Sequence, residues 1–289
     1  MAGNMAFRAR YSILLHAGAA ALAAISVLLS PTLYGADEPI TVALVFDGSN
    51  QSDREPLQAY LTQAMGRPVK VVAPDSYSQT VAGLADGTYD FACLGALTYV
   101  RSHAKYGVVP LVQRASDLEF HSVFITRTDS SIRSLRDLKG RQFAFGDINS
   151  ASAHLIPYSE LMQAGINPET DLQPRYSGSH VATAAMVESG VVEAGVLDES
   201  VFKFLIQGGK LDGKKVRVFY TSKPFVDYVY VARKDVPKAE QQQFAHALLA
   251  LKEGADDPVL IVLRAKKFIR ASDQEYDNVR QIAHELKMF

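Results

Sequence analysis

Two serines that could bind an anion, Ser150 and Ser152, lie where a short apolar strand is predicted to turn into a helix. The strand spans 141–146, breaks at Gly146, and the helix begins near Ser152. A helix start has backbone N–H groups without partners and a partial positive charge, and the two hydroxyls add donors. Such a group of donors can hold a small oxyanion. The alternative is an ordinary helix cap, because serine is a usual residue there.

The composition narrows the class of partner. The 289 residues can form one large or two medium domains, and 48% of them are hydrophobic, which is enough for a core. Beyond residue 36 the chain carries 28 basic and 31 acidic residues, a net charge of −3. A surface without a basic excess argues against nucleic acid as a partner. The lone cysteine, Cys93, excludes an intrachain disulfide, and the histidines lack metal-ligand spacing, so we expect no metal and no cofactor.

The first 36 residues have the layout of a secretory signal peptide. Arg8 and Arg10 precede an apolar run over 13–29, and the small residues Gly35 and Ala36 precede the first acid. We expect cleavage near Gly35 or Ala36 and a periplasmic mature protein. An uncleaved N-terminal anchor is the alternative, because the residue at −3 is large for either cut.

Alternating strands and helices with glycine-marked turns predict an α/β fold in two lobes, each a mostly parallel sheet flanked by helices. A strand over 120–126 is expected to cross to the second lobe, and one over 228–232 to return. We assign 37–118 and 224–289 to lobe 1 and 119–223 to lobe 2. The hinges should then lie near 113–122 and 220–228.

Four segments, taken together and in order, resemble the periplasmic phosphonate-, phosphite- and phosphate-binding proteins of ABC importers. They are Phe145–Pro157, Ser177–His180, Gly190–Gly195 and Ala271–Tyr276, and the likeness runs over about 40–288. The resemblance implies a monomeric receptor of type II topology that closes by a hinge motion on a small oxyanion. Its partner would be an ABC permease.

The resemblance also implies which residues contact the ligand. Ser150, Ala151 and Ser152 match the nest that holds the phosphonate oxygens, although many relatives have threonine at the middle position. His180 matches the histidine at the next helix start. Tyr77 matches a first-lobe tyrosine that faces the cleft, and Phe120 stands where a cleft tyrosine is common. Asp198 (or Glu199) and Asp227 match two acidic positions. Plainer interpretations remain open: a backbone-bonded histidine, a rim aromatic, a helix cap at Asp198 and a turn at Asp227.

Cys93 ends a predicted strand, and strand ends line the crevice of a parallel α/β lobe. The plain interpretation is a small buried hydrophobic residue. The alternative is a thiol ligand, because a branch of the resembled family senses arsenite through one cysteine and signals to a membrane histidine kinase. Catalytic motifs such as Gly-x-Ser-x-Gly and His-Glu-x-x-His are absent from the sequence, so we expect a binding protein and not an enzyme.

Overall fold

The computed structural model describes residues 38–44 and 52–289. The predicted signal peptide and the end of the first predicted strand at Phe46 lie outside these residues. Within the described part of the chain, no helix combines the length and apolarity needed to cross a bilayer.

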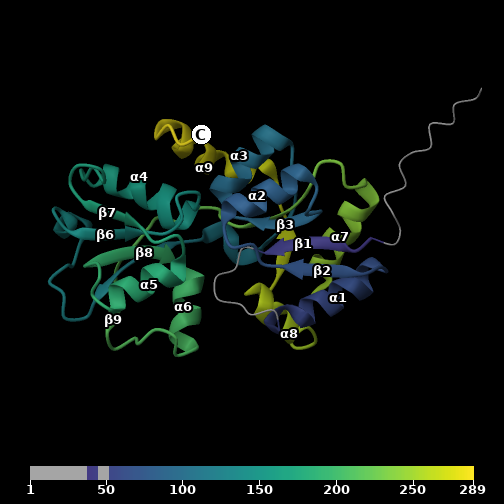
Figure 1. Ribbon diagram of the computed structural model, residues 1–289, viewed down its shortest axis with the longest axis horizontal. Helices are drawn as coiled ribbons and strands as arrows, with labels where there is room; N and C mark the ends of the chain where they lie inside the picture. Colours follow the sequence, from purple (N-terminus) through teal and green to yellow (C-terminus); the bar gives the residue numbers. More distant parts are fainter. Residues whose placement is uncertain (1–37, 45–51) are drawn as a thin grey trace, which may run out of the picture. The chain divides into compact units, whose positions relative to one another are not determined.

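The first structural unit is a six-stranded sheet with the strand order β11-β4-β10-β3-β1-β2 (Figure 1). Its strands are β1 (Ile40–Leu44), β2 (Val69–Val72), β3 (Phe91–Leu94), β4 (Val109–Arg114), β10 (Val229–Ala232) and β11 (Phe268–Arg270). Its helices are α1 (Glu55–Met65), α2 (Tyr77–Asp86), α3 (Ala96–Tyr106), α7 (Lys238–Ala250), α8 (Asp257–Leu263) and α9 (Asp277–Glu285). Apolar strands with helices on both sides explain why most of these strand residues are fully buried.

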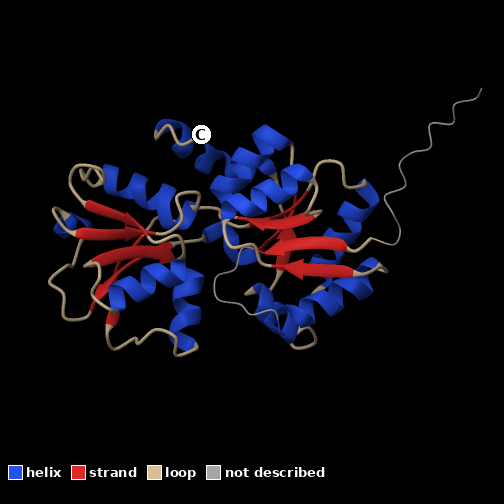
Figure 2. Ribbon diagram, viewed as in Figure 1, coloured by secondary structure: helices blue, strands red, loops and turns tan. Residues whose placement is uncertain are grey.

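The second unit is a five-stranded sheet with the order β7-β6-β8-β5-β9 (Figure 2). Its strands are β5 (Ser122–Arg127), β6 (Gln142–Phe145), β7 (Gln173–Tyr176), β8 (Ala194–Asp198) and β9 (Val216–Thr221). Its helices are α4 (Ile156–Gln163), α5 (His180–Glu188) and α6 (Glu199–Gln207). Separate hydrophobic clusters pack around Val123 and around Phe124, consecutive residues of β5 whose side chains alternate between the two faces of the sheet.

The two helix-flanked sheets are as predicted, but both sheets are mixed and not mostly parallel. Strand β1 pairs in parallel with β2 and β3, and β6 pairs in parallel with β7 and β8. The other described ladders are antiparallel, and each of them includes β5, β10 or β11. Strands β5 and β10 arrive from the other sheet, so no helical crossover obliges them to run parallel to their neighbours.

The chain crosses between the sheets twice, and the two crossings are bonded to each other. The first crossing leaves β4 through a 3₁₀ turn at Ala115–Glu119, and the second leads from β9 into β10. Phe120 and Phe225 exchange backbone hydrogen bonds of 2.9 and 3.0 Å. Both segments fall within the predicted hinges, while the lobe boundaries and the hinge motion stay predictions.

Candidate functional site

The Ser150–Ser152 segment forms the start of a π-helical turn, Ala151–Leu155 (η4), which continues into α4. Ser150 is its N-cap, and its Oγ accepts the backbone N–H of Ala153 at 3.0 Å. The hydroxyl of Ser152 is buried and has no hydrogen-bond partner within the described residues. Ala151 packs into the hydrophobic cluster of the six-stranded sheet. One serine is therefore used as a cap, and the other has an unused hydroxyl.

His180 and Asp198 are the other candidate residues on the five-stranded sheet. Together with Ser152 they form one wall of the candidate site. His180 begins α5, and its Nδ1 accepts the backbone N–H of Asp198 at 3.3 Å. Asp198 ends β8 and caps α6, where its Oδ1 accepts the N–H of Val201 at 2.9 Å. Its other oxygen, Oδ2, is buried without a hydrogen-bond partner among the described residues. Glu199, the other acidic candidate, forms an ion pair with Lys203 on its own helix.

Asp227 lies in the second crossing and contacts the start of α3 in the six-stranded unit, which forms the opposite wall of the site. Its Oδ1 accepts the N–H of Ala96 at the start of α3, at 2.9 Å, and its Oδ2 has no hydrogen-bond partner in the described chain. A Cβ on Gly95 would make an ordinary contact of 3.5 Å with that Oδ1 and a tight one of 3.3 Å with the ring of Tyr77. Tyr77 begins α2 beside it, with its hydroxyl 3.5 Å from the hydroxyl of Tyr228.

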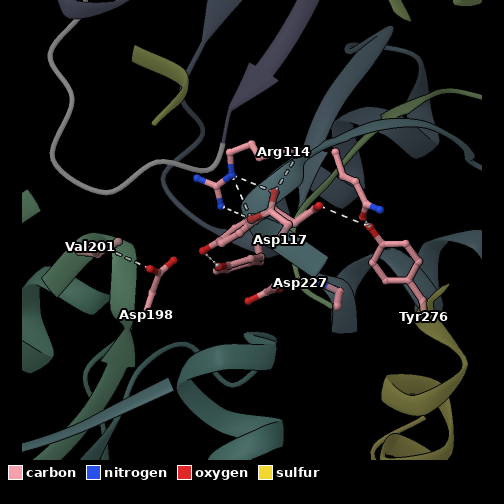
Figure 3. Close-up of polar contacts among 10 residues, drawn as sticks. Arg114, Asp117, Asp198, Val201, Asp227 and Tyr276 are labelled. Carbon is pink, nitrogen blue, oxygen red and sulfur yellow. Dashed lines mark hydrogen bonds and ion pairs between the residues drawn. The ribbon is translucent and has the colours of Figure 1, made fainter. Parts of the chain in front are cut away.

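A buried ion pair lies behind this wall and was not predicted from the sequence. Arg114 donates to Asp117 through Nη2 at 2.6 Å and through Nε at 2.8 Å, and both residues are almost completely buried (Figure 3). The guanidinium lies 5.0 Å from the ring centre of Tyr228 and 5.9 Å from that of Phe120. The only signal in the sequence is an arginine at the end of an apolar strand, which also suits an ordinary turn.

The pKa values of Asp227 and Asp198 are shifted in opposite directions. Burial raises the pKa of Asp227 to about 8, helped by the charges of Asp198 and Asp117 and opposed by the hydrogen bond from the Ala96 N–H. The Ser152 hydroxyl lies close enough to oppose the shift slightly, but it is not within hydrogen-bonding geometry of this carboxyl. Burial also disfavours the charged form of Asp198, but His180, Ser200 and Arg114 outweigh it and hold that pKa below its usual value. At neutral pH Asp227 is thus mainly a proton donor and Asp198 an acceptor.

Cys93 and Phe120 lie in the hydrophobic core of the six-stranded sheet, next to Arg114. Burial raises the pKa of the Cys93 thiol to about 12, and Tyr230 on β10 is its cross-strand neighbour. Phe120 packs edge-on against Phe225 and Tyr228. No cluster of metal-ligating side chains occurs in the part of the chain that the structure describes.

The chain is similar in sequence and in structure to known binding proteins. The chain is 29% identical over 241 residues to a probable ABC transporter phosphite-binding protein, PhnD1 of Prochlorococcus marinus, covering 78% of this chain and 81% of that protein. It superposes on the structure of PhnD1 in complex with methylphosphonate with a TM-score of 0.80, at 26% identity over 88% of this chain and 100% of that one. A binding protein component of a phosphonate transporter from Pseudomonas aeruginosa, PA3383, has the same fold, with a TM-score of 0.77 at 22% identity over 85% of this chain and 86% of that one.

A weaker likeness links the chain to a receptor of another kind. It is 25% identical over 203 residues to the tetrathionate sensor histidine kinase TtrS of Salmonella typhimurium, covering 68% of this chain but 34% of the kinase. The family profile described as "ABC transporter, phosphonate, periplasmic substrate-binding protein" matches residues 41–276. Because this match spans most of its length, the chain belongs to the family of periplasmic substrate-binding proteins of phosphonate ABC transporters.

Proposed function

We propose that the protein binds a small phosphorus oxyanion, of the phosphite or phosphonate class, between its two sheets and presents it to an ABC permease. The names of its relatives support this ligand class, because one is a probable phosphite-binding protein and its structure holds methylphosphonate. In this proposal residues 1–36 direct export to the periplasm. The protein acts as a monomer, without nucleic acid, and binds its ligand without transforming it.

The observation that carries the proposal is a set of three buried oxygens without hydrogen-bond partners in the described chain. They are Ser152 Oγ, Asp198 Oδ2 and Asp227 Oδ2. Ser152 and Asp198 belong to the five-stranded unit, and Asp227 lies in the second crossing, beside the start of α3. Native proteins satisfy most buried polar groups, and each one left unpaired costs about 1–3 kcal/mol. A ligand rich in oxygen atoms, bound between the sheets, would remove this cost.

The protonation states indicate how such a ligand is held. The Ser152 hydroxyl and the protonated Asp227 each donate to a ligand oxygen, while the ionised Asp198 accepts from a protonated ligand oxygen or from an amine. Arg114 contributes a nearby positive charge without leaving its pair with Asp117. Such a set favours a singly charged, protonated oxyanion over a fully ionised one.

Closure is supported by contacts that join the two sheets outside this cluster. Arg101 on α3 donates to Asn149 at 2.9 Å, and Asn149 donates to Ser78 on α2 at 3.4 Å. Asn149 directly precedes the anion-binding serines. Ligand binding at the serines and docking of this loop against α2 and α3 are therefore mechanically linked.

The alternative, an arsenite sensor that uses Cys93 and signals to a histidine kinase, has less support. Arsenite coordination requires a thiolate, and a thiol with a pKa of about 12 stays protonated at physiological pH. The likeness to TtrS favours a sensor partner in general, but it does not involve this cysteine in particular. The same oxyanion site would bind the ligand whether the partner is a permease or a sensor kinase.

Calorimetric titration of the purified protein tests the proposal. The panel is phosphate, phosphite, methylphosphonate, 2-aminoethylphosphonate and arsenite, applied to the wild type, Ser152→Ala, Cys93→Ala and a control, Ser159→Ala. Ser159 lies on α4, and its hydroxyl accepts from Gln163. We expect binding of phosphite or a phosphonate that weakens, by about 10- to 100-fold, only in Ser152→Ala. Binding of arsenite alone, abolished in Cys93→Ala, would overturn the assignment.

A further inference from the structure

A cavity lies between α2 and α3, which run side by side on the six-stranded sheet (Figure 1). Its volume is about 270 Å³, which is enough for a small organic molecule. The apolar part of its lining comes from Val81 and Ala82 on α2 and from the rings of Tyr77 and Tyr106. Polar atoms come mainly from α3 and from Asn149.

The cavity holds two positive charges that no acid neutralises within the described residues. Arg101 and Lys105 both line it, and neither forms an ion pair with a carboxylate of the described chain. Among the described residues, Arg101 bonds only to neutral oxygens, those of Asn149 at 2.9 Å and of the Met288 carbonyl at 2.8 Å. Burial lowers the pKa of this arginine, which shows that its charge is partly removed from water without compensation.

A third group in the lining has an unused hydrogen-bonding capacity. Ser102 is 1% exposed, and its hydroxyl has no partner in the described chain. It lies next to Arg101 in sequence and lines the same cavity. An unsatisfied buried hydroxyl beside an uncompensated guanidinium is the arrangement that an anionic group would complete.

We propose that this cavity binds a small organic carboxylate, with the carboxylate at Arg101, Ser102 and Lys105 and the apolar part against the two tyrosine rings. The mixed lining explains the choice. An inorganic anion would leave the apolar wall without a contact, and a neutral molecule would leave the partly buried charge of Arg101 uncompensated. Lys105 is exposed, and its Nζ lies 5.0 Å from the ring centre of Tyr106, so it can add a second charge at the mouth of the cavity.

The position of the cavity ties it to the oxyanion site, and the inference rests to that extent on the proposed function. Tyr77 belongs to both, and Asn149 precedes Ser150. The wall at Asn149 is complete only when the loop before η4 is docked against α2 and α3. Two sources of the carboxylate are compatible with this geometry: a separate molecule, or the substituent of a bound phosphonate.

Calorimetry with two probes distinguishes these sources. In the first arm, protein saturated with methylphosphonate is titrated with benzoate. In the second arm, the affinity for 3-phosphonopropionate is divided by that for methylphosphonate. Each arm uses the wild type, Arg101→Gln, Lys105→Gln, Ser102→Ala and the control Arg136→Gln, an exposed arginine far along the chain.

We expect one of two results. Either benzoate binds and loses at least tenfold in affinity in Arg101→Gln and Lys105→Gln, or the affinity ratio exceeds ten in the wild type and falls to about one in both variants. Arg136→Gln should behave as the wild type in each arm. Lys105→Gln and Ser102→Ala keep the test valid if loss of the Arg101–Asn149 bond impairs folding.

The inference is overturned if methylphosphonate binds but benzoate does not and the ratio stays near one in the wild type. It is overturned equally if either effect is present but unchanged in all three cavity variants. Failure of methylphosphonate and phosphite to bind at all is a different result, because it refutes the proposed function. Benzoate titration of the free protein then still tests the cavity.

Discussion

Asp198 and Asp227 occupy matching positions on the two walls of the site, yet they carry opposite charge states. Each is about 1% exposed, and each accepts a backbone N–H at a helix start through one oxygen. The pKa of Asp198 is lowered because His180, Ser200 and Arg114 outweigh burial. The pKa of Asp227 rises to about 8 because burial and two neighbouring carboxylates outweigh the hydrogen bond from Ala96. The charge state of each carboxyl is therefore not determined by its local capping geometry. It is determined by the neighbouring groups that other segments of the chain place beside it.

The largest effect should come from removing the carboxylate that holds Arg114. We expect Asp117→Asn to lower the free energy of unfolding by about 3–5 kcal/mol, because it leaves a buried guanidinium without its ion pair. Asp129→Asn breaks an exposed ion pair with Arg127 and should hardly change the free energy of unfolding, because solvent screens the pair. Urea denaturation of both variants makes the comparison. Equal losses would show that Arg114 is not held in a dehydrated environment.

The charge state of Asp227 predicts a pH dependence of stability. Its carboxyl titrates near pH 4 when unfolded and near pH 8 when folded, so the folded state keeps a proton that the unfolded state loses. Wild-type stability should fall by about 1.4 kcal/mol per pH unit across this window, relative to Asp227→Asn. Urea denaturation at pH 5, 6, 7 and 8 measures the difference.

Asp198→Asn is the matched control for this experiment, because the sign is reversed. A lowered pKa stabilises the folded protein above the unfolded pKa, and this contribution is lost as the pH falls through the folded value. The pH dependence of the free energy of unfolding should therefore differ between Asp198→Asn and the wild type below about pH 4. Parallel pH profiles for the two asparagine variants would show that the walls do not differ in charge.

Alanine substitutions at Ser150 and Ser152 should have different effects, the first on stability and the second on ligand binding. Ser150→Ala removes a cap and should lower the free energy of unfolding by about 1 kcal/mol. Ser152→Ala removes a hydroxyl without a described partner, so stability should hardly change, while affinity for phosphite or methylphosphonate should fall about 10- to 100-fold. Thermal unfolding and calorimetry on both variants test this. An unchanged affinity in Ser152→Ala would remove that serine from the site.

The smallest effect should be that of Cys93. With a pKa of about 12 the thiol is protonated and buried, so a thiol-specific reagent should label the folded protein far more slowly than the denatured one. Cys93→Ala should leave oxyanion affinity within about twofold, because no charged hydrogen bond is lost. Rapid labelling of the native protein would show that the sulfur is accessible from the site.

Much of the architecture could be predicted because it depends on local patterns. The strands around Val42 and Phe143 are apolar runs between glycine-marked turns, and these patterns are sufficient for an α/β assignment. Helix α8 and strand β11 were missed, since seven and three residues are too short to show a clear period. The prediction that each sheet is mostly parallel was wrong, because the antiparallel directions of β5 and β10 depend on the crossings and not on any one strand.

The serine segment was predictable for the same reason, because the strand, the break and the helix start are adjacent in sequence. Its residues therefore identified an oxyanion-binding candidate, and the order of its neighbours indicated a family. The contacts that set its chemistry join distant segments: Asp227 reaches Ala96 across 131 positions. Burial and neighbouring charge arise only when these segments pack together. The sequence thus determined which groups are present, and the tertiary structure alone decided which of them carry a proton, a charge or an unused hydrogen bond.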